Sequence, residues 1–224
     1  MSVSNTMASM MRLTLLWFCA LALAACSSTK PTAYSGLDSA PLLTANQHDD
    51  TSRVPYSYTP PVNWNTFTAV ILEPVVIYRG PDQQFGALAE ADKASLASYM
   101  QNQFSQKLAT RFTFNNTVTP HTLRVRITLT GAVTNTPVLG TLSRFDLAGG
   151  IYNGVQTARD REGTLTGSVI YAVEIYRAHD NRLLQAFITK QYPSPWNLSA
   201  SMGALAASKA GIEKGADALL AQLK

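Results

Sequence analysis

The chain has 224 residues, 46% hydrophobic and 14% charged, which places it in the ordinary globular range with room for one sizeable core rather than two. Its formal net charge of +4 is spread along the chain without a run of Lys or Arg, so it does not predict a nucleic-acid partner. Both cysteines, Cys19 and Cys26, lie near the start of the sequence, which excludes a disulfide framework in the folded part.

An apolar segment, residues 13–25, precedes Cys26. As a helix its thirteen residues would rise about 20 Å, less than the hydrocarbon thickness of about 30 Å, so the segment fits the apolar region of a signal peptide better than a membrane span. The small residues Ala24 and Ala25 suit cleavage by a signal peptidase. Residues 1–25 are therefore predicted to be a signal peptide.

The sequence Leu23-Ala24-Ala25-Cys26 resembles the bacterial lipobox, in which the chain is cleaved before the cysteine and diacylglycerol alkylates the thiol. The resemblance implies cleavage between Ala25 and Cys26 and lipid attachment at Cys26. Two or three acyl chains hold a protein at a membrane without a spanning segment. Ser27, rather than Asp, at the next position implies sorting to the outer membrane of a Gram-negative bacterium, with the protein facing the periplasm. The alternative is an ordinary secretory leader with an accidental cysteine.

Residues 27–67 are rich in Ser, Thr, Pro, Tyr and Asn and lack a helical or strand period, which predicts an extended arm. Such an arm reaches roughly 140 Å at full extension. Its aromatic residues indicate that parts of it pack on the domain: Tyr34, Tyr56, Tyr58 and Trp64. The predicted organisation is a signal peptide (1–25), a lipidated N-terminus with an extended arm (26–67) and one domain (68–224).

Alternation and helical spacing predict the elements of that domain. A continuous apolar strand over 68–78 contains Pro74, which implies a bulge or an unpaired edge. An amphipathic helix over 87–110 carries Leu96, Met100, Phe104 and Leu108 at steps of four. The remaining predicted elements are strands over 112–118, 122–133, 164–177 and 183–192, and a helix over 198–223.

Together these elements predict an α+β fold, with two main helices packed on one face of a mostly antiparallel sheet. The lipidated extended arm precedes it.

Several segments resemble an uncharacterised bacterial lipoprotein family with a domain of unknown function, DUF3313. They are Tyr34-Ser35-Gly36-Leu37, Val54-Pro55-Tyr56, WNTFTAVILEPVVIY from Trp64, ASLASYMQNQFSQKLATRF, TLRVRITLTGA and YAVEIYRAHDNRLLQAFITK. Their order matches the family over about residues 34–224, although the turn at 177–181 lacks the family's usual Gly. The resemblance implies an envelope location and the fold, and it brings no known activity or catalytic residues.

Motifs of common enzyme classes are absent from the sequence: there is no G-x-S-x-G, no G-x-x-x-x-G-K-[ST] and no G-x-G-x-x-G. The three histidines are far apart and lack a second His or Cys at ligand spacing, so we expect neither a metal site nor a cofactor.

Two pairs of charged residues are candidates for a site. Glu73 and Glu174 each interrupt an apolar strand, and as neighbours they could form the carboxylate pair that acid-base hydrolysis needs. The favoured alternative is that each faces solvent or pairs with a sheet arginine. Arg124 and Arg126 share one face of their strand and could bind an anionic polymer or a lipid headgroup, although solvation or ion pairing is more common for such residues.

A glycine-rich segment over 131–167 contains apolar residues near helical spacing, including Phe145 and Ile151. The part over 141–158 could contact lipid or a partner protein, or it could pack over the sheet.

We expect a non-enzymatic, membrane-anchored lipoprotein that serves as a binding or envelope-assembly module. Two alternatives stay open: an accessory subunit of an envelope transport system, and an envelope glycan hydrolase that uses Glu73 and Glu174.

Overall fold

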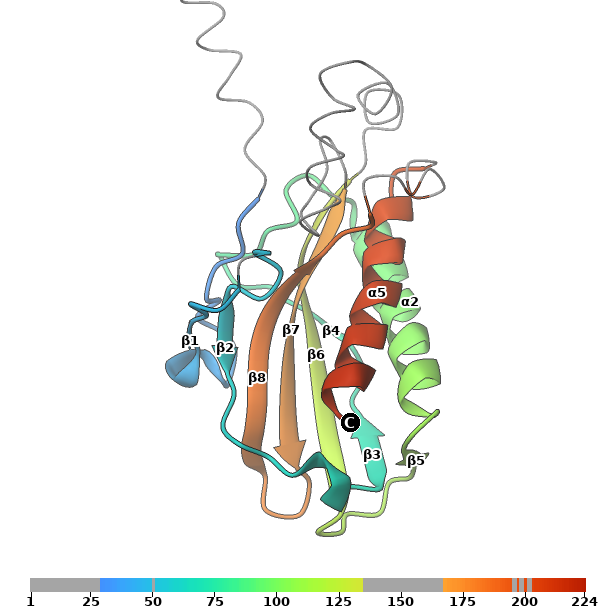
Figure 1. Cartoon of the computed structure of the whole chain (residues 1–224). Coiled ribbons are helices and arrows are strands. Elements are labelled where there is room, and N and C mark those ends of the chain that lie inside the picture. The colour runs from blue at the N-terminus through green and yellow to red at the C-terminus, as the bar shows by residue number, and fades with distance from the viewer. Residues whose placement is uncertain (1–28, 50, 135–166, 195–196, 198–199, 201–202) are drawn as a thin grey trace, which may run out of the picture. The chain divides into compact units, whose positions relative to one another are not determined.

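A mixed sheet of eight strands forms the centre of the computed structural model, which describes residues 29–49, 51–134, 167–194, 197, 200 and 203–224 (Figure 1). Two units are distinguished, Met1–Lys30 and Pro31–Lys224, and the second contains every element below. In spatial order the strands are β1 (Thr44–Ala45), β2 (Tyr56–Tyr58), β8 (Arg182–Gln191), β7 (Ser168–Arg177), β6 (Thr122–Val133), β3 (Ala69–Leu72) and β5 (Thr113–Phe114), and β4 (Val76–Ile77) also pairs with β6.

The pairing is antiparallel from β1 to β6 and parallel for β3, β4 and β5. Parallel pairing follows from the connection, because a helix returns the chain between β3 and β6. The predicted fold class, α+β with a mostly antiparallel sheet, is confirmed.

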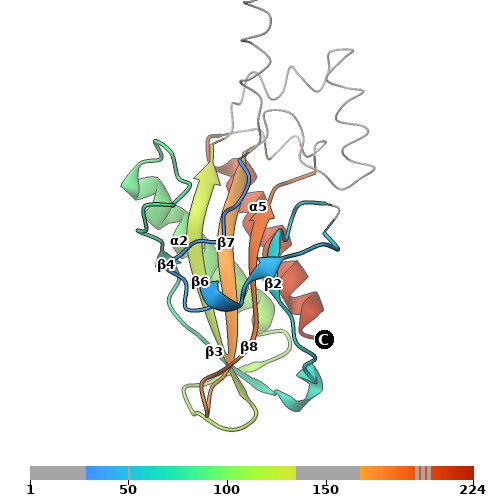
Figure 2. The ribbon, with the colours of Figure 1, turned by 90° about the vertical axis from the view of Figure 1, so that its left-hand side faces the viewer.

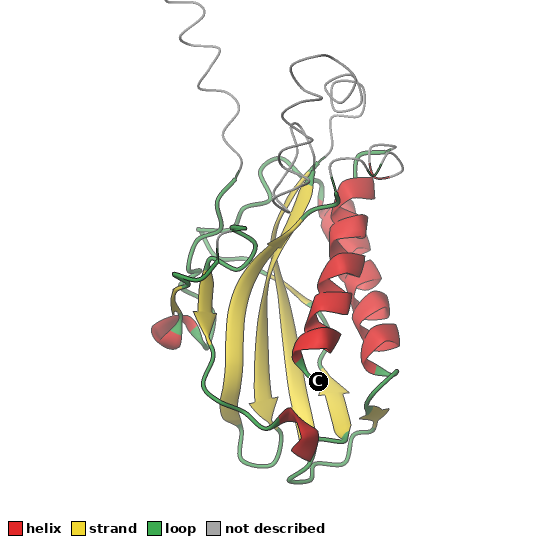
Figure 3. Ribbon diagram, viewed as in Figure 1, coloured by secondary structure: helices red, strands yellow, loops and turns green. Residues whose placement is uncertain are grey.

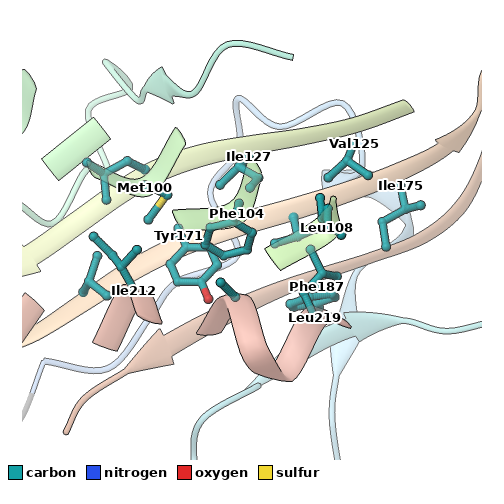
Figure 4. Packing of buried hydrophobic residues seen from close by; sticks show 14 of the residues in the cluster. Met100, Phe104, Leu108, Val125, Ile127, Tyr171, Ile175, Phe187, Ile212 and Leu219 are labelled. Atoms are coloured by element: carbon teal, nitrogen blue, oxygen red, sulfur yellow. The ribbon is translucent and has the colours of Figure 1, made fainter. Parts of the chain in front are cut away.

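Two helices, α2 (Glu90–Leu108) and α5 (Ala206–Gln222), lie side by side on one face of the sheet (Figure 3). The predicted stripe at steps of four on α2 is completely buried. Phe104 meets Tyr171 of β7 edge-on, with 5.7 Å between ring centroids. The side chains that fill this layer come from both helices and from alternate positions of β6 and β7 (Figure 4).

Strand β6 follows the predicted alternation. Leu123, Val125, Ile127 and Leu129 are completely buried in the core under the helices. The alternation shifts at a bulge between Leu129 and Gly131. A Cβ at Gly131 would lie 2.8 Å from the backbone oxygen of Gln84, so only glycine allows this close approach.

Three predicted elements differ from the structure. The strand expected over 68–78 is divided into β3 and β4, and the N–H of Val75 in the gap donates to the side chain of Gln101 at 2.8 Å. Pro74, which has no N–H, lies in this interruption. The strand expected over 112–118 is reduced to the two exposed residues of β5, and the last helix begins at Ala206 rather than at 198.

The second face of the sheet is covered by residues 34–43, here called the arm segment. Figure 2 shows this blue segment crossing in front of the strands, on the side away from the helices. The arm segment contributes Tyr34 and Leu37 to an apolar cluster with Tyr78, Ile170, Ala172 and Ile188. Farther along the predicted arm, β2 pairs with β8. The chain from Tyr34 onward is therefore packed on the sheet.

A polar network ties the start of the arm segment to the loop after β4. Asp82 accepts hydrogen bonds from the Tyr78 hydroxyl (2.7 Å) and from the backbone N–H of Ser35 (2.9 Å). The Tyr34 hydroxyl donates to the Gln84 side chain. The two hydrogen bonds, that from Tyr78 above all, lower the pKa of Asp82 below its usual range near 4.

A lowered carboxyl pKa in the folded state predicts an acid-dependent loss of stability. The unfolded chain binds the proton more readily, so the contribution of Asp82 is present above about pH 4 and is lost as pH falls through the folded-state pKa. We expect Asp82→Asn to lower the free energy of unfolding at pH 7, and the difference from the unmodified chain to shrink below about pH 4. Urea denaturation at several pH values measures this difference. A gap that stays constant into acid, or an equal gap in a Tyr78→Phe background, would contradict the assignment.

Candidate functional site

Five charged residues meet on the sheet face that carries the arm segment: Asp38, Glu73, Arg124, Arg126 and Glu174, here called the arginine–carboxylate cluster. The two arginines occupy alternate positions of β6, on the face opposite the helices. Glu174 of β7 is the cross-strand partner of Arg126. Glu73 follows β3 directly, and Asp38 comes from the arm segment. The cluster therefore joins four segments that are distant in the sequence.

Glu73 bridges the two arginines. Its Oε1 lies 3.0 Å from Arg124 Nη1, and its Oε2 lies 2.8 Å from Arg126 Nε. The Nη1 of Arg126 also pairs with Asp38 and lies 3.8 Å from the Oε2 of Glu174. Hydrogen bonding to Glu73 raises the pKa of Arg126 above its ordinary value. The structure thus matches the favoured alternative for Glu73, which was pairing with sheet arginines.

Glu174 is the most buried member of the cluster, with 2% of its surface exposed. Its Oε1 accepts the backbone N–H of Ser39 at 2.7 Å. The arm segment is therefore held to the sheet at two points, by Asp38 on Arg126 and by Ser39 on Glu174. Tyr176 packs beneath both guanidinium groups, 4.7 Å from Arg124 and 5.7 Å from Arg126 measured to its ring centroid.

Both guanidinium groups of the cluster are paired with carboxylates. Three carboxylates face two guanidinium groups, so an anion at Arg124 or Arg126 would have to compete with carboxylates that are already in place. Glu73 and Glu174 do approach one site, as a catalytic pair would, but the guanidinium group of Arg126 contacts both of them. This arrangement is suited to fastening the arm segment on the sheet.

A groove lies at the start of β6, where β7 turns into β8; this is the lower end in Figure 1. We call it the hairpin-end groove. It has a volume of about 310 Å³ and is partly open to solvent. Its lining residues are Pro60, Pro61, Val62, Asn63, Thr66, Phe67, Pro120, His121, Arg177, Arg182, Leu183 and Leu184. The sequence did not predict this groove, because three segments distant along the chain form it.

Residues 33–219 match the family described as "Protein of unknown function (DUF3313)". The chain belongs to the DUF3313 family. This confirms the resemblance noted in the sequence.

Two solved structures are similar to this DUF3313 chain: the PelC dodecamer from Paraburkholderia phytofirmans and a single-substitution variant of it. For the variant the sequence identity is 8% and the TM-score 0.37, with 75% of this chain and 90% of that chain covered. For the other structure the values are 8%, 0.35, 75% and 91%. The comparison with curated proteins found no match.

Asn181 lies in the β7–β8 turn of this DUF3313 chain. Asn181 adopts φ +60°, a left-handed conformation that Asn tolerates better than most residues. Its N–H donates to the Arg177 carbonyl at 3.0 Å, and its side-chain oxygen accepts from Arg124. Asn181 thus also links the turn to the arginine–carboxylate cluster.

Several predicted site residues lie outside the described residues, namely Ala25, Cys26, Ser27, Phe145, Ile151 and the rest of the 141–158 segment. Within the described part of the chain, no helix is long and apolar enough to cross a membrane. The same part contains no group of three or more metal-ligating side chains.

Removing Arg126 tests how strongly the cluster holds the arm segment. We expect Arg126→Met to lower the free energy of unfolding by about 3 kcal/mol, because the buried Glu174 loses its cation. Arg79 is the matched control, since its pair with Glu90 is exposed and Arg79→Met should cost less than about 1 kcal/mol. The double variant Arg126→Met, Glu174→Gln should regain part of the loss. Equal losses for Arg126→Met and Arg79→Met in chemical denaturation would show that the cluster does not fasten the arm segment.

Proposed function

We propose that this DUF3313 protein is a lipid-anchored, periplasm-facing module of the Gram-negative outer membrane that binds a ligand or an assembly partner without catalysing a reaction. The observation that carries the proposal is the run from Leu13 to Ser27. It combines an apolar stretch too short to span a bilayer with a lipobox-like cysteine and a serine at the sorting position. Two or three acyl chains at Cys26 would supply stable attachment.

The arrangement of polar groups supports binding rather than catalysis. Both candidate catalytic carboxylates, Glu73 and Glu174, are engaged by Arg126, and Glu174 also accepts a backbone hydrogen bond. The hairpin-end groove lies elsewhere and contains no acidic lining residue among those described. A concave surface without acid-base groups of the carboxylate type is suited to holding a molecule.

The packed arm segment limits how far an anchored domain would stand from the membrane. Tyr34 is 1% exposed and lies eight positions after Cys26 in the sequence. Eight residues reach at most about 28 Å, far less than the roughly 140 Å that an arm free up to residue 67 would reach. The proposed anchor therefore keeps the Tyr34 end of the domain close to the bilayer surface.

Fractionation of cells that produce Cys26→Ser tests the anchor. The variant lacks the thiol that forms the thioether, so we expect it to leave the membrane fraction and the unmodified chain to remain in the outer-membrane fraction. Ser28→Ala is the matched control, because it changes a neighbouring residue without removing the thiol, and it should fractionate like the unmodified chain. Retention of Cys26→Ser in the outer membrane would overturn the proposed attachment.

Energy transfer to a membrane acceptor tests the short tether. Once the proposed leader is removed and Cys26 is acylated, an engineered cysteine is the sole free thiol. A dye at Arg79→Cys lies near the Tyr34 end, and a dye at His179→Cys lies at the β7–β8 turn. Leu129 of β6 lies beside Tyr78, next to the first dye position, and Leu123 lies opposite Arg177, next to the second. These two leucines are six residues apart along β6, so the two dye positions are separated by about 20 Å along the strand.

We expect stronger transfer from residue 79 than from residue 179 to acceptors in the lipid headgroups. Insertion of about 40 Gly and Ser residues after Lys30 should reduce this difference, since such a linker spans about 35 Å on average. Equal transfer from both positions in the unmodified tether would contradict the orientation.

A further inference from the structure

The hairpin-end groove carries positive charge without a balancing carboxylate in its lining. Arg177 and Arg182 both line it, together with His121. None of the twelve described residues that line it is acidic. This differs from the arginine–carboxylate cluster, where carboxylates outnumber the arginines.

The two arginines of the groove are direct cross-strand partners. Arg177 of β7 is paired with Arg182 of β8 at the last register position before the turn. Like charges placed directly opposite each other in a sheet are destabilising. Asp180 in the turn lies 3.5 Å from Arg177 and so offsets one of the two charges. An anion bound between the guanidinium groups would offset the other.

Arg182 is available for such an anion. It is an exposed residue, and within the described part of the chain its guanidinium group forms neither an ion pair nor a hydrogen bond. Its backbone N–H, in contrast, is fixed by the Asp180 side chain at 3.2 Å. The turn therefore holds the backbone of Arg182 in place while its five guanidinium donors stay free.

His121 adds a third, oriented polar group. Its Nδ1 lies 2.8 Å from the carbonyl oxygen of Thr66. A carbonyl oxygen only accepts hydrogen bonds, so Nδ1 carries the proton, and Nε2 is left to accept from or, when protonated, donate to a bound molecule.

The remaining lining residues of the groove are apolar apart from Asn63 and Thr66. Proline contributes three lining residues, and the others include Val62, Phe67, Leu183 and Leu184. Proline fixes its own φ angle and so loses little entropy when a ligand binds. A volume of about 310 Å³ lies at the lower end of the range of small-molecule sites. The groove thus offers a preformed apolar surface beside a pair of arginines.

We propose that the hairpin-end groove binds a small amphipathic anion, with a carboxylate or phosphate group between Arg177 and Arg182 and an apolar portion against the proline and leucine walls. Both anionic groups match the planar fork of a guanidinium group. This inference deepens the binding role proposed above, and it is independent of the lipid anchor.

Isothermal titration calorimetry with three probes tests the proposal: 3-phenylpropionate, phenyl phosphate and the neutral 3-phenylpropanol. The full chain is used as isolated from cells, in phosphatidylcholine nanodiscs where it is membrane-bound, with empty nanodiscs as the blank. We expect saturable binding of at least one of the two anions, and binding of the alcohol at least tenfold weaker. The preference between the first two probes shows whether the groove takes a carboxylate or a phosphate.

Two matched variants separate the groove from general surface charge. Arg182→Ala removes the free guanidinium group and should weaken anion binding about tenfold or more. Arg79→Ala removes the same charge from the other end of the domain and should leave the affinity unchanged. Thermal unfolding of both variants checks that each retains the fold.

Three outcomes would overturn the proposal: no saturable binding of either anion, equal binding of 3-phenylpropanol, or an affinity that Arg182→Ala leaves unchanged. None of these outcomes affects the fractionation of Cys26→Ser, so the proposed binding site and the proposed lipid anchor can be refuted independently.

Discussion

The structure depends on the packing of the arm segment against the second face of the sheet. Nine of the ten residues of β7 are buried, and Ile170, Ala172 and Ile188 of the central strands point away from the helices into the cluster that the arm segment completes. Without that cover these side chains would face water, and each buried isoleucine contributes roughly 1.5–3 kcal/mol. The ion pair between Asp38 and Arg126 and the hydrogen bond from Ser39 to Glu174 fix the position of the segment. The chain from residue 34 is therefore part of the domain's core.

Periodic segments were the part of the fold that the sequence predicted well. The apolar residues at alternate positions of β6, and those at steps of four on α2, each predicted one buried face of the element. The structure buries both sets of side chains. Residues 34–43, which cover the second face of the sheet, showed no periodic pattern in the sequence, because their backbone is irregular. A signal for it was present in β7, whose run Val-Ile-Tyr-Ala-Val is apolar on both faces and so requires cover on both. The break at Pro74 was indicated by the proline itself, although the apolar run around it predicted one continuous strand.

The site residues likewise divide into those that a local sequence pattern identified and those that it did not. Arg124 and Arg126 were placed on one face by the period of two, and Glu73 was recognised as a possible partner because it interrupts an apolar run. Asp38 was missed, because nothing in its neighbourhood indicates which strand it will meet. The hairpin-end groove was missed for a related reason: its walls come from residues 60–67, 120–121 and 177–184, and no local spacing connects them. Both the arginine–carboxylate cluster and the hairpin-end groove are formed by contacts between segments that are distant in the sequence.

The two groups of arginines show how one sheet uses the same residue for different purposes. On the face of β6 each guanidinium group meets a carboxylate, and that pairing fastens chain to chain. At the β7–β8 turn Arg177 and Arg182 are cross-strand partners, and the carboxylate of Asp180 pairs with Arg177 alone. The cost of opposing like charges is small where water screens them, so the turn remains stable when empty. The same opposition favours any anion that enters, because binding then removes a repulsion as well as adding hydrogen bonds.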